Sequence, residues 1–277
     1  MRSKVIEQAR KENIIENRSK VGEKPNIVFF HIPKCAGTSL LGYLGQHYNG
    51  QVLADIDIDT TLEKFADIHP EKGWAFVGHI DFNHYRQITV PHVSFSIFRD
   101  PRQRLASRYF SLRDQQVDLG WPLLHLPREQ SLEEWLMVVA NKMLARNYNG
   151  PNGQEDQYYY GEILRYVIGT PRFVDLTAGK ITEEQALAEG LDNIKAFDYC
   201  LITEDLNRGK TILDAVIQVD SQSSEIIDLN QSISSGERKT AGVYEFNARE
   251  SALLDYLCRL EIPIYEAVRE IYESYFR

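Results

Sequence analysis

Short apolar runs alternate with amphipathic segments along most of the chain. The apolar runs have the length and the β-branched or aromatic content of buried strands: Ile27–His31, Trp74–Gly78, Val93–Phe98 and Tyr199–Ile202. The segments between and after them have the spacing of amphipathic helices: Thr38–Tyr48, Thr60–Ile68, Arg102–Arg113, Leu132–Ala140, Ile181–Lys195 and Thr211–Gln218. This alternation predicts an α/β fold of three layers, with a mostly parallel central sheet flanked by helices.

The two ends of the chain have different patterns. Residues 1–24 are highly charged with a thin apolar stripe, which predicts a loosely attached N-terminal helix or tail. Residues 25–277 are expected to form a single domain that closes with one or two helices in Asn247–Phe276, broken near Pro263. Residues 114–130 form an irregular insertion, and Ser131 is expected to cap the helix that follows it.

Composition narrows the classes of function. The net charge of −9 argues against a generally basic nucleic-acid-binding surface. Cys35, Cys200 and Cys258 are widely spaced, which indicates reduced thiols. The chain has no secretion-signal pattern and no apolar run near the roughly 20 residues that span a membrane, so we expect a cytoplasmic protein without a membrane span. The oligomeric state is left open.

The stretch NIVFFHIPKCAGTSL, Asn26–Leu40, has the pattern of a strand, a tight loop and a helix start. A helix N-terminus binds anions, Gly37 allows a close backbone approach, Thr38 and Ser39 offer hydroxyls, and Lys34 adds a charge. Lys34 precedes Gly37 by three positions, unlike the Gly-Lys-Ser/Thr order of triphosphate-binding loops. The loop is therefore P-loop-like without the ATP signature. An ordinary strand–helix turn with a surface lysine is the alternative.

The stretch FRDPRQRLASRYFSLR follows the strand at Val93–Phe98. Arg99 lies at the strand exit, and Ser107 lies two helical turns further on, where it can face back toward the strand. Arginine and serine are donors suited to phosphate. The other arginines are interpreted as a solvated basic face paired with acidic residues: Arg102, Arg104, Arg108 and Arg113.

Together, HIPKCAGTSL and RDPRQRLASRY resemble the signature pair of the sulfotransferases that use 3′-phosphoadenosine 5′-phosphosulfate (PAPS). Within that family the chain is most similar to the carbohydrate branch, and there to the heparan sulfate (uronyl) 2-O-sulfotransferases. The resemblance implies that Arg99 and Ser107 hold the 3′-phosphate. It also implies that the 5′-phosphosulfate is held by the first loop: Lys34, Cys35, Ala36, Gly37, Thr38 and Ser39.

The resemblance also implies a catalytic histidine, which matches His79 in FVGHIDF at the end of the second predicted strand. Histidine suits a general base because its usual pKa lies near neutrality. His84 is the rival base, with Asp81 as an orienting residue, and a buried structural role for His79 is the alternative. Lys34 would neutralise the leaving oxygen as a second catalytic residue. No metal site is expected, because no histidine pair has a ligand spacing.

The stretch SGERKTAG is similar to the basic loop that closes over the cofactor in this family. The resemblance implies that Arg238, Lys239 and Thr240 bind the cofactor, and a mobile surface loop is the alternative. Tyr158, Tyr159 and Tyr160 fit either an acceptor groove or ordinary packing.

The sequence therefore predicts a PAPS-dependent O-sulfotransferase that moves a sulfonyl group to a hydroxyl by in-line displacement with a histidine base. A sugar is the expected acceptor, in a bacterial-type cytoplasmic enzyme. The same chemistry on a small alcohol, phenol or lipid remains open, as does a non-catalytic nucleotide-binding protein. A P-loop kinase or ATPase would need the missing Gly-Lys-Ser/Thr loop.

Overall fold

The computed structural model describes residues 24–48, 51–54, 73–114, 129–144, 161–219, 239–240 and 243–277. Several sequence predictions lie outside these ranges: the charged tail apart from Lys24, the helix at residues 60–68, most of the insertion at 114–130, the tyrosines at 158–160 and Arg238.

The centre of the molecule is a parallel sheet of five strands in the order β2-β3-β1-β4-β5. The strands are β1 (Ile27–Phe30), β2 (Val52–Ala54), β3 (Ala75–Gly78), β4 (Val93–Phe98) and β5 (Tyr199–Ile202). Residues of β1, β3 and β4 are buried throughout, as expected for strands covered on both faces. The predicted α/β fold with a parallel sheet is confirmed. The short strand β2 was not predicted from the sequence.

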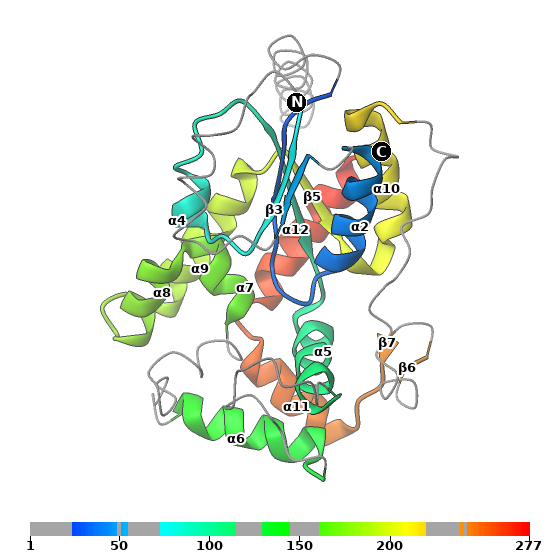
Figure 1. Ribbon diagram of the computed structural model, residues 1–277. Coiled ribbons are helices and arrows are strands. Elements are labelled where there is room, and N and C mark those ends of the chain that lie inside the picture. Colours follow the sequence, from blue (N-terminus) through cyan, green and yellow to red (C-terminus); the bar gives the residue numbers. More distant parts are fainter. Residues whose placement is uncertain are drawn as a thin grey trace.

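Helices cover the sheet on both sides, with α2 and α10 on one side and α7 and α9 on the other (Figure 1). The helices are α2 (Gly37–His47), α4 (Phe82–Tyr85), α5 (Pro101–Asp114), α6 (Leu132–Leu144), α7 (Glu162–Ile168), α8 (Thr170–Thr177), α9 (Glu183–Asn193), α10 (Leu206–Ile217), α11 (Ala248–Leu257) and α12 (Ile262–Ser274). Short 3₁₀ turns cover Ile194–Ala196 and Thr203–Asp205, and β6 (Lys239–Thr240) pairs with β7 (Val243–Tyr244). No helix in the described ranges is long and apolar enough to cross a membrane.

Local sequence signals explain where several helices begin. Ser131 caps α6, because its hydroxyl accepts a hydrogen bond from the Glu134 N–H at 3.2 Å while Glu134 accepts one from the Ser131 N–H at 2.8 Å. The C-terminal segment divides into α11 and α12, and Pro263 lies in the first turn of α12, where proline is tolerated. Helices α7 and α8 were not predicted; every residue of α7 is buried, and five of its seven residues are apolar, so the helical period in its sequence is weak.

Candidate anion-binding and catalytic site

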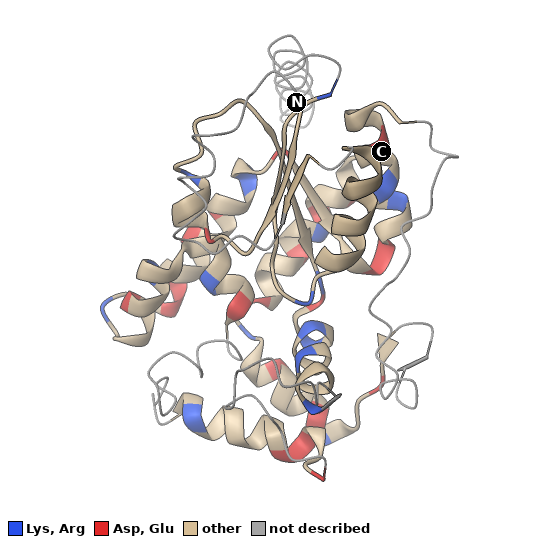
Figure 2. Ribbon diagram, in the orientation of Figure 1, with Lys and Arg blue, Asp and Glu red and all other residues tan. Residues whose placement is uncertain are grey.

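Three loops meet at one edge of the sheet. Strands β3, β1 and β4 are neighbours, and Phe30 at the end of β1 pairs with Gly78 of β3 and Ser96 of β4. Because the strands are parallel, the loop at Lys34–Ser39, the residue His79 and the residue Arg99 all leave from this edge. In Figure 2, basic residues of α5 lie directly beyond the loop that follows β1.

The backbone of the β1–α2 loop is strained. Lys34 and Ala36 have φ values of 68° and 59°, in the left-handed region that residues with a side chain rarely adopt. Ala36 is the N-cap of α2, and no side chain caps the helix. The N–H groups of Gly37 and Thr38 make no hydrogen bond within the described residues. An uncapped helix start behind left-handed residues is a suitable site for an anion.

Gly37 has a packing role that the sequence did not show. A Cβ atom at Gly37 would lie 1.7 Å from His31 Nε2, so the ring of His31 occupies the space of the missing side chain. On its other side this ring stacks on His79, with 4.2 Å between ring centroids. Burial, and then the charges of His79 and Lys34, lower the pKa of His31 to about 3. His31 is therefore neutral near pH 7 and supports the loop from behind.

The side chain of Lys34 lies among other cations. Burial, followed by the charges of Arg108 and Arg99, lowers the pKa of Lys34 to about 8. Arg99 donates a hydrogen bond to the backbone carbonyl of Lys34 at 3.3 Å. In the part of the chain that the structure describes, none of these three cations forms an ion pair with a carboxylate. Such a group of unpaired cations is costly unless an anion joins it.

The remaining predicted loop residues differ in exposure. Cys35 is fully buried, and burial raises the pKa of its thiol to about 12, so its side chain stays protonated and only its backbone is available. Thr38 is exposed, whereas Ser39 is buried. Ser107 is partly buried on α5, and its hydroxyl makes no hydrogen bond within the described ranges.

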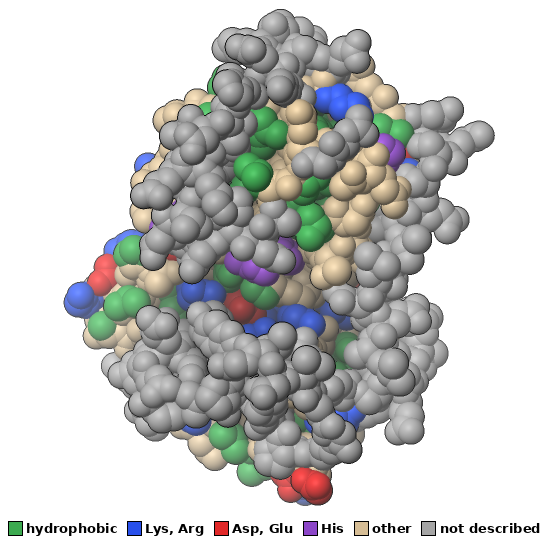
Figure 3. All heavy atoms as spheres, in the orientation of Figure 1, with side chains coloured by type: hydrophobic (Ala, Val, Ile, Leu, Met, Phe, Trp, Pro, Cys, Tyr) green, Lys and Arg blue, Asp and Glu red, His purple; other side chains and the backbone are tan. Residues whose placement is uncertain are grey.

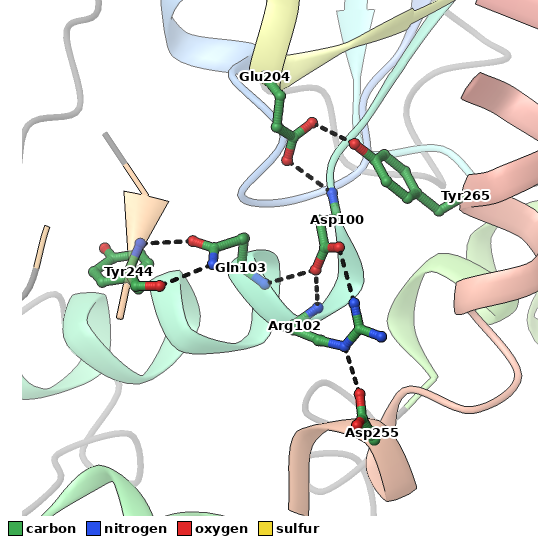
Figure 4. A network of polar contacts seen from close by, with 7 residues as sticks. All are labelled: Asp100, Arg102, Gln103, Glu204, Tyr244, Asp255 and Tyr265. Atoms are coloured by element: carbon green, nitrogen blue, oxygen red, sulfur yellow. Dashed lines mark hydrogen bonds and ion pairs between the residues drawn. The ribbon is translucent and has the colours of Figure 1, made fainter. Parts of the chain in front are cut away.

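Helix α5 is held at its N-terminus by the polar network in Figure 4. Asp100 accepts hydrogen bonds from the N–H groups of Arg102 and Gln103 at 2.9 and 3.2 Å. Glu204 accepts one from the Asp100 N–H at 2.9 Å and one from the Tyr265 hydroxyl at 2.8 Å. These contacts fix the direction in which α5 leaves the sheet, and with it the position of Arg99.

The interpretation of the other α5 arginines as a solvated face holds for Arg102, which pairs with Asp255 at 2.6 Å. It is wrong for Arg104, which is completely buried and bonded to Glu162, with Glu261 at 4.0 Å. It is also wrong for Arg108, which is partly buried and whose charge acts on Lys34.

Among the described residues, Asp81 forms no hydrogen bond with His79, the predicted catalytic histidine. Its carboxylate contacts Nδ1 of His84 at 2.6 Å and accepts a hydrogen bond from the Thr170 N–H at 2.7 Å. Burial alone would raise the pKa of Asp81, but these hydrogen bonds lower it below its usual value. Asp81 therefore orients His84 and ties the end of β3 to the start of α8.

The segment with the predicted basic loop is attached beside Arg99. Gln103 exchanges two hydrogen bonds with the backbone of Tyr244, at 2.8 and 3.1 Å. The centroid of the Tyr244 ring lies 5.9 Å from Cζ of Arg99. Tyr244 of β7 pairs with Lys239 of β6. The structure thus places the backbone of Lys239 and Thr240 in the strand next to Tyr244.

Comparison with known proteins now adds to this geometry. A family model described as "Sulfotransferase family" matches residues 17–277. The chain belongs to the sulfotransferase family. Among solved structures, this sulfotransferase is similar to a sulfotransferase from Alicyclobacillus acidocaldarius, with 13% identity, a TM-score of 0.49 and coverage of 90% of this chain and 96% of that one. A search of curated proteins returns no match.

The candidate site gathers most of the predicted residues along one edge of the sheet. The space-filling view in Figure 3 shows histidine, basic and acidic side chains together at the centre of one face. Sequence reasoning missed Arg108 and the buried Arg104–Glu162 pair. A signal existed for the former, since Arg108 directly follows Ser107 and lies four residues after Arg104 on the same helix face.

Proposed function

We propose that this sulfotransferase moves the sulfonyl group of PAPS to a hydroxyl of a sugar acceptor. Family membership supports sulfonyl transfer in general. The observation that supports this donor is a set of cations that form no ion pair within the described ranges, Lys34, Arg99 and Arg108, next to an uncapped helix N-terminus. A nucleotide with phosphate and phosphosulfate groups supplies the negative charge that this arrangement needs.

In this proposal the backbone and hydroxyls of the loop Lys34–Ser39 bind the 5′-phosphosulfate. Arg99 and Ser107 bind the 3′-phosphate, and the segment at Arg238, Lys239 and Thr240 closes over the nucleotide. The contact between Arg99 and the Tyr244 ring supports this arrangement, because it puts that segment beside the arginine. Protein cations and N–H groups supply all of the neutralisation, so no magnesium is required in the proposal.

When bound, the donor presents its sulfonyl group to an acceptor oxygen for in-line attack. His79 removes the proton of the acceptor hydroxyl, and Lys34 neutralises the leaving oxygen. The stack supports His79 in this role, because the neutral ring of His31 lies behind it and adds no second positive charge.

The identity of the acceptor rests on the resemblance to the 2-O-sulfotransferases. The net charge of −9 gives no support to a long acidic glycan, which favours a short saccharide. A small alcohol, phenol or lipid is the second candidate within the same chemistry. A binding protein without turnover is the candidate outside it.

The test of the base compares two histidine variants that differ in their partners. His79→Asn should lower kcat by about 10²- to 10⁴-fold while the affinity for 3′,5′-bisphosphoadenosine stays unchanged. His84→Asn is the matched control, because His84 is fixed by Asp81, and it should retain most of the turnover. Turnover would be measured with PAPS and a panel of saccharides, alcohols and phenols. Loss in His84→Asn but not in His79→Asn would move the base to His84, and no turnover in the wild type would favour the binding protein.

A further inference from the structure

Arg108 is the arginine of α5 that the fold does not explain. Arg102 pairs with Asp255, Arg104 bonds Glu162, and Arg113 lies over the rings of Tyr109 and Phe110. In contrast, Arg108 makes no hydrogen bond or ion pair anywhere in the described structure, although its Nε atom is buried. A buried donor without a partner is uncommon, and a bound ligand would supply the missing acceptor.

The helix period gives the direction of this side chain. Arg104 and Arg108 are four residues apart and so share one face of α5. Arg104 on that face is completely buried, is bonded to Glu162 at the start of α7 and lies close enough to Cys35 for its charge to lower the pKa of that thiol. Arg108 lies one turn further along the same face, about 6 Å beyond Arg104. It therefore continues the row along the same face of α5.

The charges that act on Lys34 support an assignment of Arg108 to one end of the donor. Among the neighbouring charges, that of Arg108 acts most strongly on Lys34, ahead of that of Arg99. Arg99 contacts the Lys34 carbonyl and Tyr244, on the side given to the 3′-phosphate. Arg108 is thus a second cation that acts on the Lys34 ammonium, separate from Arg99. It fits the phosphosulfate end of the nucleotide.

We propose that Arg108 binds the sulfonate oxygens of the donor, next to Lys34. This inference rests on the proposed function. The planar donor fork of arginine can bond two oxygens of a tetrahedral anion at once, which a lysine cannot do. Arg108 then orients the group that is transferred, and its charge balances the sulfonate as attack begins. It is a catalytic residue, because it contacts the reacting group.

The test uses two nucleotides that differ only in the sulfonate, PAPS and 3′,5′-bisphosphoadenosine, with affinities measured by calorimetry without acceptor. Arg108→Gln should lower the affinity for PAPS by about ten-fold or more and change the affinity for the bisphosphate by less than about two-fold. Arg108→Lys should recover part of the loss, since it keeps the charge without the fork. Arg113→Gln is the matched control on the same helix and should leave both affinities unchanged.

The thermal midpoint separates this role from a structural one. Because Arg108 has no hydrogen-bond or ion-pair partner among the described residues, Arg108→Gln should keep or raise the Tm, whereas a structural arginine would lower it. Equal weakening of both nucleotides, or of neither, would overturn the inference. Failure of the wild type to bind either nucleotide would instead overturn the proposed function. Arg99→Gln is the positive control: it should weaken the binding of both nucleotides, which shows that phosphate binding is being measured.

Discussion

Lys34 combines two features that the fold would avoid without a ligand. Its backbone is in the left-handed region, and its ammonium lies near two arginines without a carboxylate partner in the described structure. Both features raise the free energy of the folded protein when no substrate is bound. A bound polyanion removes the electrostatic part of this cost, so the charge state of Lys34 should depend on whether the site is filled.

This dependence predicts proton uptake on binding. With a pKa of about 8, part of the Lys34 population is neutral at pH 8, and an adjacent polyanion raises that pKa. Binding of 3′,5′-bisphosphoadenosine at pH 8 should take up about half a proton, and the affinity should fall as the pH rises above 8. Calorimetry in two buffers of different ionisation enthalpy measures the uptake. Lys34→Met should abolish it; the same uptake in that variant would assign the proton to another group.

At this scale, the sequence predicted residues whose signal is local. Lys34, Arg99 and His79 follow strand ends in recognisable stretches, and the structure brings all three to one edge of the sheet. The sequence could not predict that Gly37 makes room for the ring of His31, because that contact depends on the angle at which α2 leaves the loop.

Helix α5 is the element that connects the site to the rest of the fold. Its first turn is capped by Asp100, and its buried face is joined to α7 through Arg104 and Glu162. Glu261, just before α12, lies 4.0 Å from the same arginine and accepts a hydrogen bond from the Ile163 N–H at 2.5 Å. Burial raises the pKa of Glu261, and the charge of Arg104 opposes this shift. These contacts fix the helix that carries Ser107.

Breaking this buried pair should be costly. Glu162→Ala would leave the Arg104 charge buried without its partner, and should lower the free energy of unfolding by about 3–5 kcal/mol. Asp255→Ala is the matched control, because it removes the partner of Arg102 at an exposed position and should cost less than about 1 kcal/mol. Urea denaturation of both variants gives the comparison. A loss of similar size in both, or a small loss in Glu162→Ala, would show that the buried pair contributes little.

Elements with a clear period were predicted well, and elements without one were not. The apolar runs gave β4 and β5 with their observed bounds. Helix α7 was missed because all of its residues are buried, Glu162 and Arg165 among them. The charges on α5 were misread because Arg104 meets a partner 58 positions away, beyond the reach of any local pattern.

The whole molecule is acidic, yet its candidate site is basic. The net charge is −9, while Lys34, Arg99 and Arg108 gather at the edge of the sheet where three loops meet. The strand order places the loops of β3, β1 and β4 side by side and so produces this local field from residues far apart in the chain. This local positive field suits a small polyanion better than an extended polyanion.

The central claim is that this edge binds a 3′-phosphorylated adenine nucleotide. It is tested most directly by calorimetric titration with 3′,5′-bisphosphoadenosine without magnesium, beside ATP with magnesium. We predict binding of the bisphosphate without metal, far tighter than that of magnesium-ATP and weakened in Arg99→Gln. Binding of magnesium-ATP but not of the bisphosphate would contradict the account.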